Sequence, residues 1–440
     1  MHRPTRPTLL MAFIPWLWAC SSTDSEPADG PSGTPDAQID CSVPASNQRI
    51  YQLLKDVYLW PEHIPQVDPR SFESAQALIE SLRYDEFDRW SYINTIAQNN
   101  SYYVDGQRIG IGIRMRSDID QSLRVSLVYP GSPASDQNLM RGDRIFSING
   151  KTIDEIDQNE LWAGIFGPDE EGIPVELSIQ RMNGSSENLT LEKRLYTFVT
   201  THTYRVFPFA GRTVGYLLFD RFIGSSTGEL NKVFGEFKNQ GVNELVLDLR
   251  YNGGGYIDVS HHLANLIGGQ SSAGKVFTQI AHNKYHSNWN KEQIFEVLEQ
   301  SLDLPRVFMI STSSTASASE QLINGLASTI DIVLIGEKTY GKPVGSGAWT
   351  DCDLSIHPIS FRMINSKGRG DFFNGLFPTC GARDNLDLAL GDENESSLSE
   401  ALYAMKTGFC TIKAAPPQSL PQIKQAPRLK MPDEVGAYSF

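Results

Sequence analysis

Short apolar strands alternate with helical segments along the second half of this 440-residue chain. Because consecutive strands of such a chain join one sheet and the intervening helices cover it, the pattern predicts an α/β layered core over residues 198–412. The expected strands are Val214–Phe219, Leu245–Leu249, Val307–Ser311 and Ile332–Gly336, and the expected helices are Gly228–Lys238, Tyr256–Ile267 and Ala316–Ala327.

The regions outside this core differ from it in composition. Residues 46–100 place apolar side chains at helical spacing, as at Ile50, Leu54 and Val57, which predicts a small N-terminal helical domain. Residues 21–45 are rich in Ser, Asp, Pro and Gly and are expected to form a flexible linker. Residues 413–440 contain five prolines and little periodicity, which predicts a C-terminal tail.

Length and charge narrow the class of protein. A chain of 440 residues can form two or three domains with substantial cores. Its net charge of −14 argues against nucleic acid or an anionic lipid surface as the main partner.

Two residues of the core carry the strongest chemical signal. Ser317 lies where a strand is expected to give way to a helix, in the run Thr-Ala-Ser-Ala-Ser-Glu of residues 315–320, and Lys342 follows in Tyr-Gly-Lys-Pro. A serine hydroxyl needs a base to become a nucleophile, and a lysine amine is a base only when neutral. Lowering the pKa of a lysine by about three units through burial costs roughly 4 kcal/mol. The pair therefore indicates hydrolysis, although a helix N-cap is a common alternative role for a serine such as Ser317.

A glycine-rich junction is the second chemical signal. The run Asp-Leu-Arg-Tyr-Asn-Gly-Gly-Gly of residues 248–255 ends an apolar strand and begins a helix. Glycines permit positive φ and let backbone N–H groups face a ligand. The run lacks the lysine of a phosphate-binding P-loop. We therefore expect an oxyanion hole formed by the amide of Gly254 or Gly255 together with that of Ala318.

Residues 101–197 have a different pattern. The run Gly110-Ile111-Gly112-Ile113 is followed by an alternating strand at Leu123–Val128, and then by Pro-Gly-Ser-Pro-Ala and the run ending at Asn-Gly of residues 149–150. This succession resembles a PDZ domain of the bacterial protease type. The resemblance implies that an extended peptide adds to a sheet edge while backbone amides of the Gly-Ile-Gly-Ile loop hold its C-terminal carboxylate.

Other residues could carry the same chemistry. Ser319 is a rival nucleophile, and Lys338 is a rival base without the Gly-Lys context. A Ser-His-Asp triad could use His261 or His262, although helix packing is the more ordinary role. His282 and His286 could share a helical face as metal ligands, but the sequence shows no pattern for a third ligand near them.

Together these motifs resemble the carboxy-terminal processing proteases, the tail-specific S41-type Ser/Lys peptidases. The family pattern Asp-Leu-Arg-x-Asn-x-Gly-Gly is matched from Asp248 to Gly255, including Arg250 and Asn252, and Ser-Ala-Ser-Glu is matched from Ser317 to Glu320. The resemblance covers residues 46–412. It implies a crotonase/ClpP-like β-spiral protease core, with Ser317 as nucleophile, Lys342 as general base and Arg250, Asn252 and Glu320 in support.

The resemblance also implies the activity, with one departure. It implies a serine endopeptidase without metal or cofactor, acting on polypeptides whose apolar C-termini the PDZ domain captures. Many members carry glutamine four residues beyond the lysine, where this chain has Ser346. A catalytically inactive peptide-binding scaffold is therefore the alternative. An ester- or carbohydrate-cleaving hydrolase would share the nucleophile but would have no use for a PDZ domain.

The first twenty residues predict export. Arg3 and Arg6 precede an apolar stretch, Leu9–Ala19, that is too short to span a bilayer and fits a signal peptide. The run Leu-Trp-Ala-Cys of residues 17–20 resembles a bacterial lipobox, which implies lipidation of Cys20 and anchoring on the periplasmic side of the outer membrane. An ordinary signal peptide is the alternative.

The remaining cysteines are expected to form disulfides. Cys41, Cys352, Cys380 and Cys410 allow three pairings in an exported chain. We expect Cys352–Cys380 and Cys41–Cys410, with free buried thiols as the alternative.

The predicted domains follow from these patterns. They are a signal peptide at 1–20, a linker at 21–45, a helical domain at 46–100, a PDZ domain at 101–197, a peptidase core at 198–412 and a tail at 413–440. The last four residues, Ala-Tyr-Ser-Phe, are apolar enough to be a candidate ligand for the chain's own PDZ domain.

Overall fold

The computed structural model describes residues 39–412. It begins with helix α1 (Val43–Val57), which packs on α2 (Ala75–Leu82) through Ile50, Leu54 and Leu78. The helix starts inside the stretch predicted as linker, because Pro44 suits the first turn of a helix. Strand β1 (Tyr92–Thr95) then pairs antiparallel with β19 (Leu354–His357), so the helical region shares a sheet with the distant part of the chain.

Residues 107–197 form a β-rich unit. Its sheet has the order β3-β4-β5-β7-β8, and β6 pairs with β5. Strand β3 lies at one edge, so one side of its backbone has no neighbouring strand within the described residues. The strands and helices of this unit are β2 (Gln107–Gly110), β3 (Ile113–Ser117), β4 (Leu123–Val128), α4 (Pro133–Asp136), β5 (Arg144–Ile148), β6 (Lys151–Thr152), α5 (Ile153–Gln158), β7 (Pro174–Gln180), β8 (Ser186–Glu192) and β9 (Arg194–Thr197).

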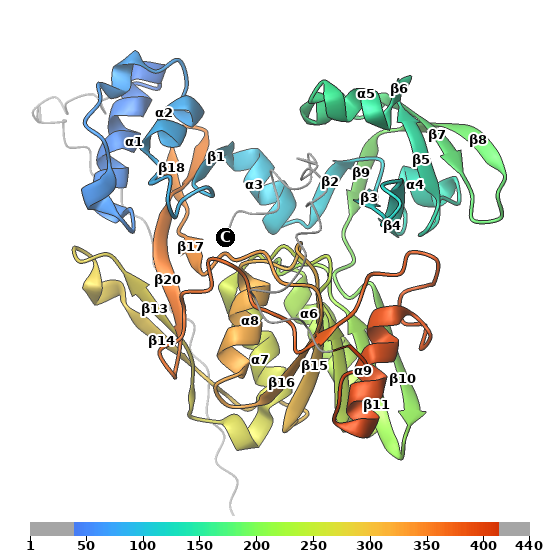
Figure 1. The fold of residues 1–440 in the computed structure, drawn as a ribbon. Helices are drawn as coiled ribbons and strands as arrows, with labels where there is room; N and C mark the ends of the chain where they lie inside the picture. Colours follow the sequence, from blue (N-terminus) through green and yellow to red (C-terminus); the bar gives the residue numbers. More distant parts are fainter. Residues whose placement is uncertain (1–38, 413–440) are drawn as a thin grey trace, which may run out of the picture. The chain divides into compact units, whose positions relative to one another are not determined.

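The core is built on a sheet of order β10-β11-β12-β15-β16-β21 (Figure 1). All neighbouring pairs are parallel except β10 and β11. Its strands are β10 (Thr203–Phe209), β11 (Arg212–Leu218), β12 (Glu244–Asp248), β15 (Arg306–Ser311), β16 (Asp331–Gly336) and β21 (Cys380–Gly381).

Helices cover both faces of this sheet because its strands are apolar on both sides. Leu245 and Leu247 of β12 pack toward α6 (Ser226–Asn239), α7 (Ile257–Ser272) and α8 (Ala318–Leu326), and α7 and α8 lie side by side (Figure 1). Val246 faces the other way, into the cluster that contains α9 (Ser396–Thr407). The predicted mixed α/β fold with an N-terminal helical region is confirmed, and a β-rich unit lies where the PDZ domain is expected.

A second sheet has the strand order β14-β13-β20-β17. Its strands are β13 (Val276–His282), β14 (Lys291–Ile294), β17 (Val344–Ser346) and β20 (Ile359–Asn365), and β18 (Trp349–Asp351) pairs with β19. Lys342 lies two residues before β17, so this sheet fixes the path of the chain that leaves the lysine.

Two disulfides are present, as expected, but the expected pairing is wrong. The bonds join Cys41 to Cys352 and Cys380 to Cys410. The first pair forms because α1 docks beside the β18–β19 turn, where Arg49 Nε donates to Asp351 Oδ1 at 2.5 Å. The Cys41–Cys352 pair could not be predicted from the sequence because 311 positions separate the two residues, which come together only through tertiary packing.

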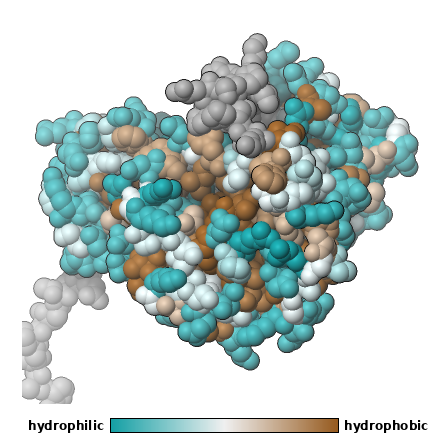
Figure 2. Space-filling view, turned by 60° about the horizontal axis from the view of Figure 1, so that its bottom comes forward, coloured by the Kyte–Doolittle hydropathy of each residue, from teal (hydrophilic) through white to brown (hydrophobic). Residues whose placement is uncertain are grey.

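On the face shown in Figure 2, hydrophilic residues (teal) lie mostly around the margin, and hydrophobic residues (brown) are exposed toward the centre. Among the helices that the structure describes, none is long and apolar enough to cross a bilayer. The predicted signal peptide, the lipidation site Cys20 and most of the linker lie outside the described residues, as does the tail.

Candidate active site

Ser317 occupies the sharp turn that precedes α8. Its backbone adopts φ 56 and ψ −116, a left-handed conformation that costs a non-glycine residue about 1–3 kcal/mol. The side chain is fully buried, and Oγ makes no hydrogen bond with the described residues. Ser317 thus holds the N-cap position without using its hydroxyl as a cap, which leaves Oγ available for chemistry.

The carboxylate of Glu320 ties the nucleophile to the lysine segment. Its Oε2 accepts hydrogen bonds from the backbone N–H of Ser317 at 3.0 Å and of Lys342 at 2.7 Å. Its Oε1 accepts from Gly341 N at 2.7 Å and from Thr339 Oγ1 at 2.5 Å. Because one oxygen atom bonds both nitrogens, the backbones of Ser317 and Lys342 are held close together although 25 positions separate them in the sequence.

Glu320 is itself fully enclosed. Burial raises its pKa to about 7, against the opposing influence of its four hydrogen bonds. The residue therefore acts as a buried structural brace between the start of α8 and the segment of residues 339–342.

Lys342 is fully enclosed by the surrounding residues. Its exposed fraction is 0%, and burial lowers its pKa to about 7, while the charges of Asp88 and Glu320 oppose that shift. The Nζ atom lies 5.9 Å from the centroid of the Trp90 ring. A substantial fraction of this amine is therefore neutral near pH 7, which is the form that can accept a proton.

The glycine-rich junction lies directly against Ser317. A Cβ atom on Gly254, whose φ is 108, would stand 2.8 Å from Ser317 Cβ and 3.0 Å from Ala318 N. A Cβ on Gly255, whose φ is 136, would stand 2.0 Å from Phe222 O. Both positions therefore require glycine, and the structure places this turn beside the first amide of α8.

The hydrogen bonds distinguish the two glycine amides. Gly254 N already donates to Asn252 Oδ1 at 2.9 Å. Within the described residues, no hydrogen bond uses the amides of Gly255 or Ala318. An oxyanion held at this turn would therefore meet two amides. That of Ala318 is the first of α8, and that of Gly255 belongs to the glycine turn beside the start of the helix.

Arg250 and Asn252 stabilise this turn from its buried side. The Arg250 guanidinium is fully buried and forms ion pairs with Asp248, Asp384 and Glu395. Asn252 Nδ2 donates to Phe219 O at 3.0 Å, while its backbone oxygen accepts from Ala316 N at 3.1 Å. Both side chains fix the backbone and stay buried.

Ser346 lies four positions after Lys342 in the sequence but forms no hydrogen bond with its side chain. It ends β17, and its buried Oγ makes no hydrogen bond with any described residue, Lys342 included. Whatever orients the lysine amine in this chain, Ser346 does not do so by direct hydrogen bonding.

The residues predicted to bind a peptide line a separate cavity of about 230 Å³. Gly112, with φ 79, sits against Ser132, where a Cβ would approach Ser132 Cβ to 2.0 Å. No hydrogen bond of the described residues uses the amides of Ile111 or Gly112, and edge strand β3 starts at Ile113. The lining is Arg108, Ile109, Gly110, Ile111, Gly112, Ile113, Met115, Ala163, Phe166, Gly167, Asp169, Lys193 and Tyr196.

The rival residues have other partners. Ser319 Oγ donates to Asn252 O at 3.0 Å, and Lys338 Nζ lies 5.6 Å from the Phe377 ring centroid. His261 Nε2 pairs with Ile294 O, and His262 Nε2 pairs with Asn231 Oδ1.

The premise that His282 and His286 share a helical face is wrong. His282 ends strand β13, and His286 stacks on Trp289 in the loop that follows. Within residues 39–412, one group has metal-ligand spacing, and it comprises Cys380, Glu400 and Cys410. Its two cysteines form a disulfide and are therefore unavailable as thiolate ligands.

Sequence reasoning missed Asp88 and Trp90. Both come from the loop between α2 and β1, and both side chains are buried beside Lys342. The run Asp-Arg-Trp-Ser of residues 88–91 has no periodicity and no recognisable catalytic spacing, so only the three-dimensional contact reveals it.

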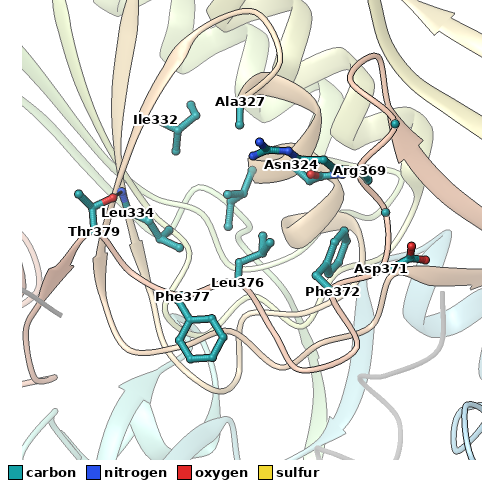
Figure 3. A pocket seen from close by; sticks show the side chains of 13 residues that line it. Asn324, Ala327, Ile332, Leu334, Arg369, Asp371, Phe372, Leu376, Phe377 and Thr379 are labelled. Carbon is teal, nitrogen blue, oxygen red and sulfur yellow. Dashed lines mark hydrogen bonds between the residues drawn. The ribbon is translucent and has the colours of Figure 1, made fainter. Parts of the chain in front are cut away.

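A larger cavity, of about 520 Å³, lies at the other end of α8 (Figure 3). Asn324 of α8 and Ala327, which follows the helix, line the cavity together with Phe372, Leu376 and other residues of the loop before β21. Asn324 lies seven positions, roughly 10 Å along the helix axis, from Ser317. This cavity contains neither Ser317 nor Lys342, so it is distinct from the candidate active site.

Comparison with known proteins gives matches to three family models. Family models match the chain for the peptidase S41 N-terminal domain over residues 45–92, the PDZ domain over 103–192 and peptidase family S41 over 213–356. The chain is therefore similar to peptidase family S41 over residues 213–356, and the matches before this segment follow the order of an S41 N-terminal domain and a PDZ domain.

Two curated relatives are named as proteases. A Staphylococcus aureus (strain MRSA252) protein designated a probable CtpA-like serine protease is 27% identical over 299 residues, which is 68% of this chain and 56% of the relative. The carboxy-terminal processing protease CtpA of Bacillus subtilis (strain 168) is 27% identical over 233 residues, 53% of this chain and 47% of the relative. The chain thus spans about half the length of the curated relatives it matches.

Two solved structures share the fold. A Bacteroides fragilis protein described as a "putative S41 protease" has a TM-score of 0.68 at 23% identity, covering 87% of this chain and all of the other. The photosystem II D1 C-terminal processing protease has a TM-score of 0.51 at 18% identity, and the match covers 83% of this chain and 97% of the other.

Proposed function

We propose that this protein is a serine endopeptidase that cleaves polypeptides near their C-termini with a Ser317–Lys342 dyad. The observation that carries the proposal is a fully buried lysine, with its pKa lowered to about 7, whose backbone Glu320 holds close to that of Ser317. The Ser317 hydroxyl makes no hydrogen bond with the described residues. A structural lysine gains nothing from such burial, whereas a general base requires it.

The proposed reaction uses the groups at the turn in sequence. Neutral Lys342 accepts the proton of Ser317 as Oγ attacks the peptide carbonyl, and the amides of Gly255 and Ala318 stabilise the resulting oxyanion. The lysine ammonium then protonates the leaving amine, which frees the new C-terminal product. Water, deprotonated by the same amine, hydrolyses the acyl-enzyme.

The PDZ cavity supports a preference for apolar C-termini. Its wall includes Ile111, Ile113, Met115 and Phe166, and the amides of Ile111 and Gly112 suit a terminal carboxylate. A peptide extending β3 by one strand would be held by backbone bonds while its last side chain entered the cavity. The chain's own C-terminus remains a candidate ligand by sequence, and it lies outside the described residues.

We also propose an exported location with a lipid anchor at Cys20. The signal-like residues 1–20 motivate this proposal, and two disulfides suit an oxidising compartment such as the periplasm. Labelling cells with radioactive palmitate would test it, since a Cys20→Ser variant should lose the label.

The activity is tested with a flexible reporter peptide that ends in an apolar residue. Ser317→Ala and Lys342→Ala should each lower kcat/KM by about a thousandfold or more. Lys338→Ala is the matched control, because that lysine lies over Phe377 in the same segment and should leave turnover unchanged. Equal turnover in wild type, Ser317→Ala and Lys342→Ala would refute the mechanism.

The alternative function is a peptide-binding scaffold without catalysis. The observation that favours it is the absence of a hydrogen bond from Ser346 to Lys342. Such a scaffold would bind the reporter through its PDZ cavity and leave it intact, and a fluorophosphonate probe would not label Ser317.

A further inference from the structure

The lysine amine is enclosed by residues from outside the peptidase core. The loop between α2 and β1 brings Trp90 to 5.9 Å from Lys342 Nζ, measured to the ring centroid. Trp90 Nε1 also bonds Tyr340 OH at 3.3 Å, and the Arg89 guanidinium lies over both rings. The N-terminal domain thus contacts the segment Tyr340–Lys342 directly.

Asp88 is held rigidly at the base of this loop. Its Oδ1 accepts from the backbone N–H of Trp90 at 2.8 Å and of Ser91 at 3.0 Å. Its Oδ2 accepts from Tyr58 OH at 2.7 Å and Ser91 Oγ at 2.5 Å. Four donors and an exposed fraction of 3% leave the carboxylate little freedom, so its charge is fixed in place.

We propose that Asp88 is the positioning residue for Lys342, with Trp90 as the cover that keeps water from the amine. The inference rests on the proposed role of Lys342 as general base. It assigns to the N-terminal domain an orienting role that Ser346 does not fill by hydrogen bonding with the described residues.

The charged groups around the amine support this assignment. Asp88 is the largest charge influence on Lys342, and Glu320 of α8 is the next. His357 of β19 faces the amine as well, but burial and the neighbouring lysine lower its pKa to about 4, so it is neutral. Glu320 accepts from the backbone N–H groups of Ser317 and Lys342 and so braces the turn. Asp88 is instead fixed in the loop whose Trp90 ring lies beside the amine, which makes it the charge best placed to orient the ammonium.

An Asp88→Asn variant is suited to the test because the fold can accept it. The amide oxygen can replace Oδ1, where both donors are backbone N–H groups. The amide NH2 then replaces Oδ2 and faces the hydroxyls of Tyr58 and Ser91, which can rotate and accept its hydrogen bonds. Asp85→Asn is the matched control, since Asp85 is exposed and only three positions away.

Two readouts separate this inference from the proposed function. The first is the pH dependence of kcat/KM on the reporter peptide. Loss of the Asp88 charge should move the acid limb to lower pH by roughly one unit and reduce the plateau about tenfold or more. Trp90→Ala should move the limb to higher pH, because water would then reach the amine.

The second readout needs no activity. The 13Cε signal of Lys342 is titrated by NMR in the Ser317→Ala protein, with and without Asp88→Asn, and is assigned by its loss in Lys342→Met. The midpoint should fall by roughly one unit with Asp88→Asn and stay fixed with Asp85→Asn. An unmoved midpoint in the folded variant overturns the inference even if the enzyme is active. A shifted midpoint in a protein that never cleaves supports the inference and removes the proposed function instead.

Discussion

At the scale of single residues, the site depends on backbone conformations that few residues tolerate. Ser317 is held at φ 56, while Gly255 at φ 136 lies against Phe222. The bonds that hold this geometry are the Glu320 bond to Ser317 N and the Asn252 bond to Ala316 N. A strained turn held from both sides presents its hydroxyl and amides in one fixed arrangement.

Gly255→Ala tests that arrangement. The added Cβ would overlap Phe222 O at 2.0 Å, so the turn must shift and its amide must move away from the oxyanion position. We expect kcat/KM on the reporter peptide to fall by about a hundredfold or more. Gly228→Ala in α6 is the control, because a Cβ there meets nothing within 4 Å and activity should not change. Activity of Gly255→Ala within a few-fold of wild type would show that this amide is not a donor.

At the scale of elements, local sequence patterns located the core well. The strand predicted at Leu245–Leu249 is β12 (Glu244–Asp248), and the helix predicted at Ala316–Ala327 is α8 (Ala318–Leu326). These elements are buried on nearly every side, so their apolar runs and terminal small residues are strong signals. The positions of the motif residues around Ser317 and Gly255 could also be predicted, because these residues lie at the ends of such elements.

Contacts between distant segments were not predictable in the same way. Asp88 and Trp90 precede Lys342 by about 250 positions and lie in a loop without periodicity. The disulfide pairing was wrong for the same reason, because Cys41 meets Cys352 only after α1 has docked beside β18 and β19. Spacing along the chain carries no signal for pairs that tertiary packing brings together.

At the scale of the whole molecule, ion pairs bind the PDZ domain to the core. Arg114 of β3 pairs with buried Asp220 at 3.0 Å, and Arg141 pairs with Asp384 at 2.5 Å. Asp384 also pairs with Arg250 beneath the glycine-rich turn, and its pKa is lowered by Arg250 and the other arginines despite its burial. The PDZ domain is therefore joined to residues that support the catalytic turn.

The two disulfides should differ in their effect on stability. Cys41–Cys352 closes a separation of 311 residues and Cys380–Cys410 one of 30. Loop-closure entropy then gives roughly 5.7 kcal/mol for the long loop and about 3.6 kcal/mol for the short one. We expect Cys41→Ser/Cys352→Ser to lower the free energy of unfolding more than Cys380→Ser/Cys410→Ser, measured by urea denaturation. A larger loss from the short-loop pair would mean that local packing outweighs chain entropy.

The most direct measurement of the central claim is the rate at which a fluorophosphonate labels Ser317 as a function of pH. A neutral Lys342 should activate the hydroxyl, so the wild-type rate should rise with pH and reach half its maximum near pH 7, the pKa of the buried amine. Lys342→Met should abolish this rise, and peptide mapping should find the adduct on Ser317. Labelling that is independent of pH, or equal in Lys342→Met, would contradict activation of Ser317 by this lysine.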